Sequence, residues 1–200
     1  TYLALLVRAA SRVFRVGIDL DSEELPRLDG QERHPLLVLS RHAGPGDSFL
    51  LVHAVLAADR RPRIVLKGAL QWAPVIDIGL NRLPRFFVER GAPKGTGTRA
   101  VRQLSATMGP GDALILFPEG KNYTPRRRAL SIDTLESQGR HAEAESAREM
   151  RHVLMPRAGG ALAALEVDAE ADVVFVAHTG LEDFSSVVDL WRGIPLDTDI

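Results

Sequence analysis

Short apolar runs alternate with amphipathic stretches along most of the chain. Runs typical of strands lie at 35–40, 63–67, 84–89, 113–117 and 172–177. The first and the last two are apolar enough to indicate buried strands. Helical patterns lie between them, at 47–58, 69–78 and 98–108. This alternation predicts an α/β domain with a mainly parallel or mixed central sheet flanked by helices. Polar or glycine-rich loops follow the strands, so we expect a site at one edge of that sheet.

The segment 121–155 breaks this alternation. It begins with Arg126–Arg127–Arg128 and continues as a charged stretch rich in Ala and Glu, which predicts an exposed helix. No internal repeat or flexible linker separates two cores, so we interpret residues 1–200 as a single domain. Because the sequence starts at Thr1 and runs directly into an apolar segment, we expect a piece to be missing at one or both ends.

Residues 1–16 form an amphipathic pattern. One helical face would carry three arginines and the other would be apolar, with Arg8, Arg12 and Arg15 on the first and Leu3, Leu6, Val7, Ala10, Val13 and Phe14 on the second. A basic amphipathic helix can lie in a lipid interface. A helix that packs on its own domain with solvated arginines fits the same pattern, and both interpretations stay open.

Composition narrows the chemistry. The chain has 25 basic and 26 acidic residues, so its overall charge gives no argument for binding nucleic acid. It has no cysteine, which excludes a disulfide framework, a thiolate metal site and a cysteine nucleophile. No apolar stretch reaches the roughly 20 residues of a membrane-spanning helix.

A histidine and an aspartate flank a turn after the first strand, in His42–Ala43–Gly44–Pro45–Gly46–Asp47. On a continuous helix, residues five positions apart point about 140° away from each other. The Gly–Pro–Gly run prevents that helix, and a tight turn can bring the carboxylate back to the imidazole. Asp47 would then accept one ring N–H and leave the other ring nitrogen as a general base. The alternative is that His42 satisfies a loop and Asp47, or Ser48, caps the next helix.

A second block, Phe117–Pro118–Glu119–Gly120, also follows a strand pattern directly. Together with His42–Asp47, with Phe86–Phe87–Val88–Glu89–Arg90 and with the segment Lys67–Leu70 followed by Pro74 and Gly79, it resembles the glycerolipid acyltransferases of the lysophosphatidate acyltransferase family. The resemblance covers about residues 36–122. It departs from the family pattern at Lys121–Asn122–Tyr123 and Pro84, and in a last strand without flanking prolines, which bears on the acceptor head group.

The resemblance implies roles for six residues. His42 would deprotonate an acceptor hydroxyl, and Asp47 would orient the imidazole. Arg90 would bind the phosphate of a lysophospholipid, Glu119 and Gly120 would shape the acceptor site, and Lys67 is a weaker candidate for contact with an anion. The donor would be the thioester of acyl-CoA or acyl carrier protein, with no other cofactor. The protein would work peripherally or anchored at the cytoplasmic face of a membrane.

Rival functions lack the residues they need. The Gly91–Thr98 loop has no Gly–Lys–Ser/Thr ending, which argues against nucleotide hydrolysis, although it can hold a phosphate or be a plain loop. No serine-hydrolase elbow or zinc-protease motif is present. We interpret His34, His53, His141 and His152 as structural or solvated, and His178 as a strand-end residue that can approach the site. A non-catalytic lipid-binding domain of the same fold remains the alternative, although binding alone would not need a base and its orienting carboxylate.

Overall fold

The computed structural model describes residues 34–44, 46–67, 84–89 and 91–180, together with Leu5, Ala9, Arg12, residues 15–17 and residues 198–199. The predicted helix at 1–16 lies mostly outside these residues, and the one at 69–78 lies wholly outside them. None of the helices in the described part of the chain is both long enough and apolar enough to span a membrane.

The centre of the fold is a five-stranded sheet in which every pair of neighbouring strands is parallel. Its order is β4-β3-β5-β2-β6, with β2 at Leu36–Ser40, β3 at Arg61–Lys67, β4 at Arg85–Val88, β5 at Asp112–Leu116 and β6 at Asp172–Val176. Two further short strands, β1 (Val16–Gly17) and β7 (Thr198–Asp199), pair with each other in parallel. The predicted α/β class and sheet are therefore confirmed, and the sheet is parallel rather than mixed.

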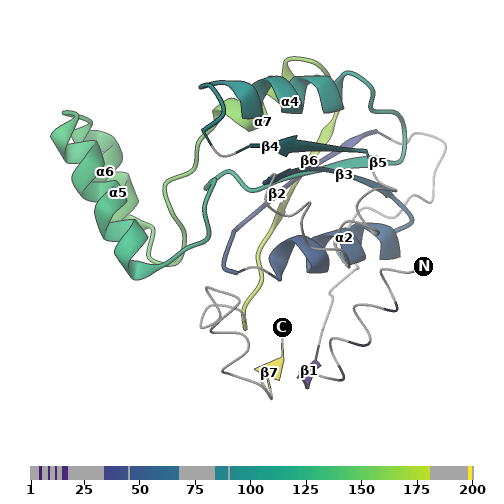
Figure 1. Cartoon of the computed structure of the whole chain (residues 1–200), viewed down its shortest axis with the longest axis horizontal. Helices are drawn as coiled ribbons and strands as arrows, with labels where there is room; N and C mark the ends of the chain where they lie inside the picture. Colours follow the sequence, from purple (N-terminus) through teal and green to yellow (C-terminus); the bar gives the residue numbers. More distant parts are fainter. Residues whose placement is uncertain are drawn as a thin grey trace.

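Helices cover both faces of the sheet, which makes three layers (Figure 1). Helix α2 (Asp47–Ala57) covers one face, and helices α4 (Thr96–Ser105) and α7 (Gly159–Leu165) cover the other. Side chains of β2 alternate between the two layers, as a strand requires. Leu36 and Val38 pack with α2, whereas Leu37 and Leu39 pack with α4 and α7. Every residue of β2 and of β5 is buried, which explains the apolar runs Leu36–Leu39 and Ala113–Leu116 within them.

The prediction that 172–177 forms a buried strand is wrong. Among the described strands, β6 lies at the edge of the sheet and pairs with β2 alone. Its residues are partly or largely exposed, and the Phe175 side chain is 79% exposed. An apolar run does not distinguish an edge strand from a central one, because both can consist of β-branched and aromatic residues.

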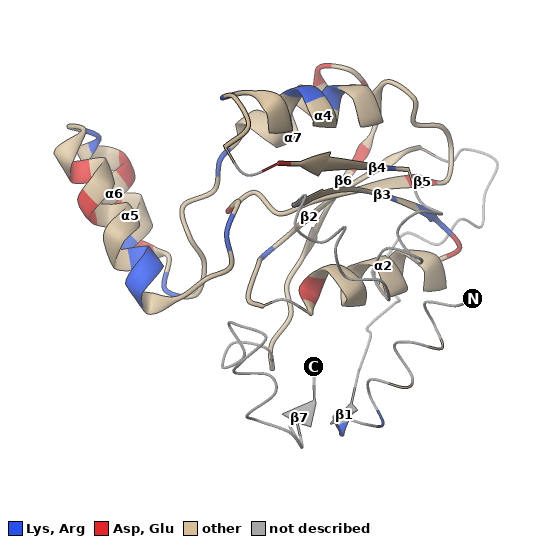
Figure 2. Cartoon of the chain, in the orientation of Figure 1, with Lys and Arg blue, Asp and Glu red and all other residues tan. Residues whose placement is uncertain are grey.

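Residues 125–149 form a helical hairpin that extends away from the sheet (Figure 1). Helix α5 (Pro125–Ser137) and helix α6 (His141–Glu149) are joined by a turn in which Gly139 has a φ of +72°, so the single exposed helix expected here is interrupted. Charged residues of both signs gather on the hairpin (Figure 2). It has a small apolar core of its own, formed by Ile132, Leu135, Ala144 and Ala147, with Met155 packed against it.

The two ends of the sheet differ in character. At the amino end, the buried carboxylate of Asp112 at the start of β5 accepts a hydrogen bond from Arg63 at 2.7 Å and forms an ion pair with Arg61, with Nε of Arg61 2.8 Å from Oδ1. This ion-pair network ties β3 to β5. At the carboxyl end, the loops after β2, β5 and β6 converge and carry the residues singled out in the sequence.

Candidate active site

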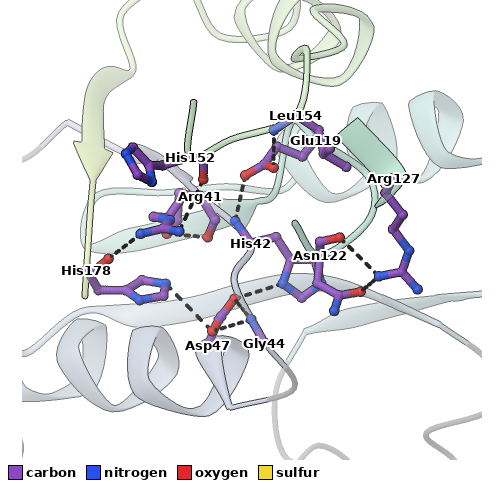
Figure 3. A network of polar contacts seen from close by, with 11 residues as sticks. Arg41, His42, Gly44, Asp47, Glu119, Asn122, Arg127, His152, Leu154 and His178 are labelled. Carbon is purple, nitrogen blue, oxygen red and sulfur yellow. Dashed lines mark hydrogen bonds and ion pairs between the residues drawn. The ribbon is translucent and has the colours of Figure 1, made fainter. Parts of the chain in front are cut away.

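The turn after β2 brings His42 and Asp47 together. The Nδ1 atom of His42 lies 2.8 Å from Oδ2 of Asp47, and the Asp47 side chain is fully buried (Figure 3). The amide of Gly44 donates to both carboxylate oxygens, at 3.1 and 2.9 Å, which closes the turn. Gly46 is the N-cap of α2 and Asp47 its first residue, so Asp47 does not have the N-cap role considered for it and its side chain points back to the loop. The partial positive charge at the helix N-terminus favours the ionised carboxylate.

Contacts with Asp47 and Phe117 define the orientation of the His42 ring. With Nδ1–H donating to Asp47, Nε2 carries the lone pair of the neutral imidazole. The ring lies 4.5 Å from the ring of Phe117 between centroids, at an interplanar angle of 32°. The His42 side chain is 16% exposed, so it is accessible to a small reacting group while most of its surface is packed.

Glu119 connects three segments at this edge. Its Oε1 accepts from the His42 amide at 2.7 Å, and its Oε2 accepts from the Leu154 amide at 2.6 Å (Figure 3). The residue is only 6% exposed. Burial raises the pKa of this carboxyl above its ordinary value, against the opposite effects of the two backbone donors and of the nearby His42 and Arg41. Glu119 therefore positions the backbone of His42.

Gly120 completes the tight turn after Glu119. Its amide donates to the carbonyl of Phe117 at 3.0 Å, and its φ of +70° is a conformation that glycine adopts without strain. A Cβ atom at this position would lie 3.8 Å from Nη1 of Arg157. The amide of Arg157 in turn donates to the carbonyl of Pro118 at 2.9 Å, so the segment after the hairpin supports this turn.

The segment Lys121–Asn122–Tyr123, noted as a departure from the family pattern, lies against His42. The amide of Tyr123 donates to the His42 carbonyl at 2.6 Å, and its hydroxyl donates to the carbonyl of Arg151 at 2.7 Å. Asn122 accepts from Arg127 through its carbonyl at 3.0 Å (Figure 3). These contacts were not foreseen from the sequence, because most of them use backbone groups that every residue has.

Arg41 is another residue whose contacts the sequence did not predict. Its Nη1 donates to the carbonyl of His178 at 2.8 Å and its Nη2 donates to the carbonyl of His152 at 3.1 Å (Figure 3). His178 in turn places Nε2 3.6 Å from Oδ1 of Asp47. His178 therefore does approach the site, whereas His152 takes part through its backbone.

Two predicted site residues cannot be placed. Arg90 lies outside the described residues, and Lys67 is described only as the last residue of β3. Their contacts with an anion stay predictions. The Gly91–Thr98 loop leads into α4 through Gly95, whose φ is +85°. The described residues contain no group of His, Cys, Asp and Glu side chains suited to a metal ion.

The parallel three-layer fold, with a partly buried histidine beside a buried aspartate where β2 ends, defines an α/β domain whose polar site lies at the carboxyl edge of the sheet. A family model described as Acyltransferase matches residues 20–179. The chain therefore belongs to the glycerolipid acyltransferase family, which includes the lysophosphatidate acyltransferases. Comparisons with curated proteins and with solved structures found no match. Family membership supports acyl transfer from a donor to an acceptor.

Proposed function

We propose that this chain moves a fatty acyl group from acyl-CoA or acyl carrier protein to the hydroxyl of a lysophosphatidate-like lysophospholipid, with His42 as general base. The observation that carries the proposal is the 2.8 Å contact between Nδ1 of His42 and a fully buried Asp47, in a chain of an acyltransferase family. The carboxylate fixes one tautomer of the ring and leaves Nε2 for the acceptor.

The chemistry follows from this arrangement. Nε2 of His42 takes the proton of the acceptor hydroxyl as its oxygen attacks the thioester carbon. The tetrahedral intermediate then collapses, the carbon–sulfur bond breaks, and the imidazolium returns the proton to the departing thiolate. Asp47 stabilises the imidazolium between these two steps. General-base catalysis of this kind contributes about 10²- to 10⁴-fold in rate.

The remaining residues serve substrate binding in this proposal. Glu119 and Gly120 shape the acceptor site, because their turn lies directly beside His42. Arg90 holds the acceptor phosphate, for which its planar guanidinium is suited, and Lys67 adds a weaker contact with an anion. The protein works at the cytoplasmic face of a membrane, where its lipid acceptor resides, and residues 1–16 contribute to its attachment.

The test is a thiol-release assay with an acyl thioester and lysophosphatidate, comparing the wild type with His42→Ala. We expect the substitution to lower the rate by at least about 100-fold. His141→Ala, which changes an exposed histidine at the start of α6, is the matched control and should keep the wild-type rate. If the protein releases the donor thiol and His42→Ala releases it as fast as the wild type, the catalytic assignment is refuted. Lysolipid binding without release from either class of donor would favour the non-catalytic alternative.

A further inference from the structure

His178 lies beside the catalytic pair because of the strand register. Strands β2 and β6 are parallel neighbours, and the last registered pair is Ser40 with Val176. His42 and His178 each follow two residues beyond that pair, so the two histidines leave the sheet at the same level. The Asp47 carboxylate lies between them, with Oδ2 2.8 Å from Nδ1 of His42 and Oδ1 3.6 Å from Nε2 of His178 (Figure 3).

Arg41 fixes the backbone of His178 in this place. Its guanidinium donates to the His178 carbonyl at 2.8 Å and its amide donates to the Val176 carbonyl at 3.4 Å. The same guanidinium holds the His152 carbonyl at 3.1 Å. The His178 side chain is only 12% exposed, so its approach to Asp47 is part of the packed interior rather than a surface contact.

We propose that His178 is a positioning residue that holds the Asp47 carboxylate from the side opposite His42. This inference rests on the function proposed above. The Gly44 amide donates to both oxygens of Asp47, and Oδ2 faces Nδ1 of His42. His178 faces the other oxygen, so it restricts rotation of the carboxylate about its Cβ–Cγ bond and keeps Oδ2 directed at Nδ1 of His42. The 3.6 Å separation is too long for a direct hydrogen bond, so the effect is mainly electrostatic.

The charges around His178 make its protonation state matter. Asp47 at the start of α2 faces its ring, His42 lies across that carboxylate, and the Arg41 guanidinium binds its carbonyl. Glu119 accepts from the His42 amide, and the His152 carbonyl accepts from the Arg41 guanidinium. A positive charge on His178 would stabilise the Asp47 anion, because the two groups face each other.

The activity test compares His178→Phe with His178→Gln. The Phe variant keeps a ring but loses the polar nitrogen, whereas Gln keeps a neutral donor. Loss of the polar contact with Asp47 should raise the activation barrier by about 1.4 kcal/mol, so we expect kcat to fall about tenfold in the Phe variant with KM nearly unchanged. The Gln variant keeps a polar contact and should stay within about threefold of the wild type. His152→Gln, which alters an exposed imidazole but keeps the carbonyl bound by Arg41, is the control and should be neutral. Equal losses in the Phe and Gln variants, or none in the Phe variant, would overturn the proposal.

A second measurement does not depend on activity. Histidine ring resonances followed by NMR across a pH titration report the pKa of His178 directly. Replacing Asp47 by Asn removes the negative charge and should lower that pKa, whereas replacing His42 by Gln leaves the carboxylate to His178 alone and should raise it. His141 and His152 are internal references. If neither substitution moves the His178 titration, His178 does not interact with Asp47. If the wild type transfers no acyl group but both shifts occur, the proposed function fails while the contact stands.

Discussion

Glu119 offers the sharpest test of how this site is held together, because both of its oxygens accept a backbone N–H. Replacing it by Gln keeps the shape but leaves only one acceptor oxygen. The amide nitrogen must then face the N–H of either His42 or Leu154, so one donor at a site only 6% exposed loses its partner. Losing a hydrogen bond to a charged group costs about 1.5–3 kcal/mol. Gln carries no charge, so the variant avoids the cost of burying a carboxylate, which is the effect that raises the pKa of Glu119. This offsets part of the lost hydrogen bond, and we expect Glu119→Gln to lower the free energy of unfolding by about 1–3 kcal/mol at neutral pH.

Urea unfolding followed by circular dichroism measures this difference, and hydrogen exchange locates it. The amides of His42 and Leu154 should exchange faster in Glu119→Gln than in the wild type, whereas amides of β5 should be unaffected under native conditions. Glu149→Gln, at the exposed end of α6, is the matched control and should stay within about 0.5 kcal/mol of the wild type. Unchanged stability together with unchanged protection of both amides would refute the bridging role of Glu119.

Three further predictions concern pH, backbone conformation and lipid binding. The native pKa of Glu119 lies above its ordinary value of 4.5, so the contribution of this group to stability is greatest below pH 4.5 and declines as pH rises through the raised native pKa. The difference in unfolding free energy between the wild type and Glu119→Gln should therefore shrink over that pH window and then level off. A difference that stays constant with pH would contradict this prediction. Gly120→Ala should lower the free energy of unfolding by about 1–2 kcal/mol, because the φ of Gly120 is +70°. Gly97→Ala should raise it by about 0.5–1 kcal/mol, because Gly97 lies inside α4 and an added Cβ would meet open space. Denaturant unfolding of the two variants should show changes of opposite sign if backbone strain is the cause. Flotation with anionic liposomes tests the proposed lipid contact of residues 1–16, and binding should weaken with salt and with neutral substitutions of three arginines, Arg8, Arg12 and Arg15.

The sequence predicts the strands of the sheet well where buried positions carry apolar residues. It predicts them less well where a buried polar side chain is paired with a residue far away in the sequence. The continuous apolar runs of β2 and β5 predict central strands, and both strands are buried throughout. Strand β3 begins at Arg61, two residues earlier than its apolar pattern suggests. Arg63 is buried there because Asp112, nearly fifty positions away, neutralises it, and such a pairing leaves no local signal in the sequence.

The candidate site divides in the same way. His42 and Asp47 became candidates because their residue types and spacing carry chemical meaning, and Glu119 became one through the resemblance to the family. Arg41 acts on backbone carbonyls, and Leu154 contributes only its amide, so neither has a side-chain pattern that a motif can express. His178 needed one more step. Once β2 and β6 are known to be parallel neighbours, counting from Ser40 and Val176 places it opposite His42.

The segment between Tyr123 and Leu154 shows why the backbone contacts that support the site could not be derived from the sequence. The chain leaves the site after Tyr123, forms the α5–α6 hairpin, and returns to donate the Leu154 amide to Glu119. Arg128 closes the excursion by donating to the Met150 carbonyl at 2.7 Å, and the hairpin has its own apolar cluster. A segment whose sequence predicts an exposed, charged helix therefore returns the chain to the candidate site. The geometry around His42 therefore depends on the folding of the α5–α6 hairpin as well as on the sheet.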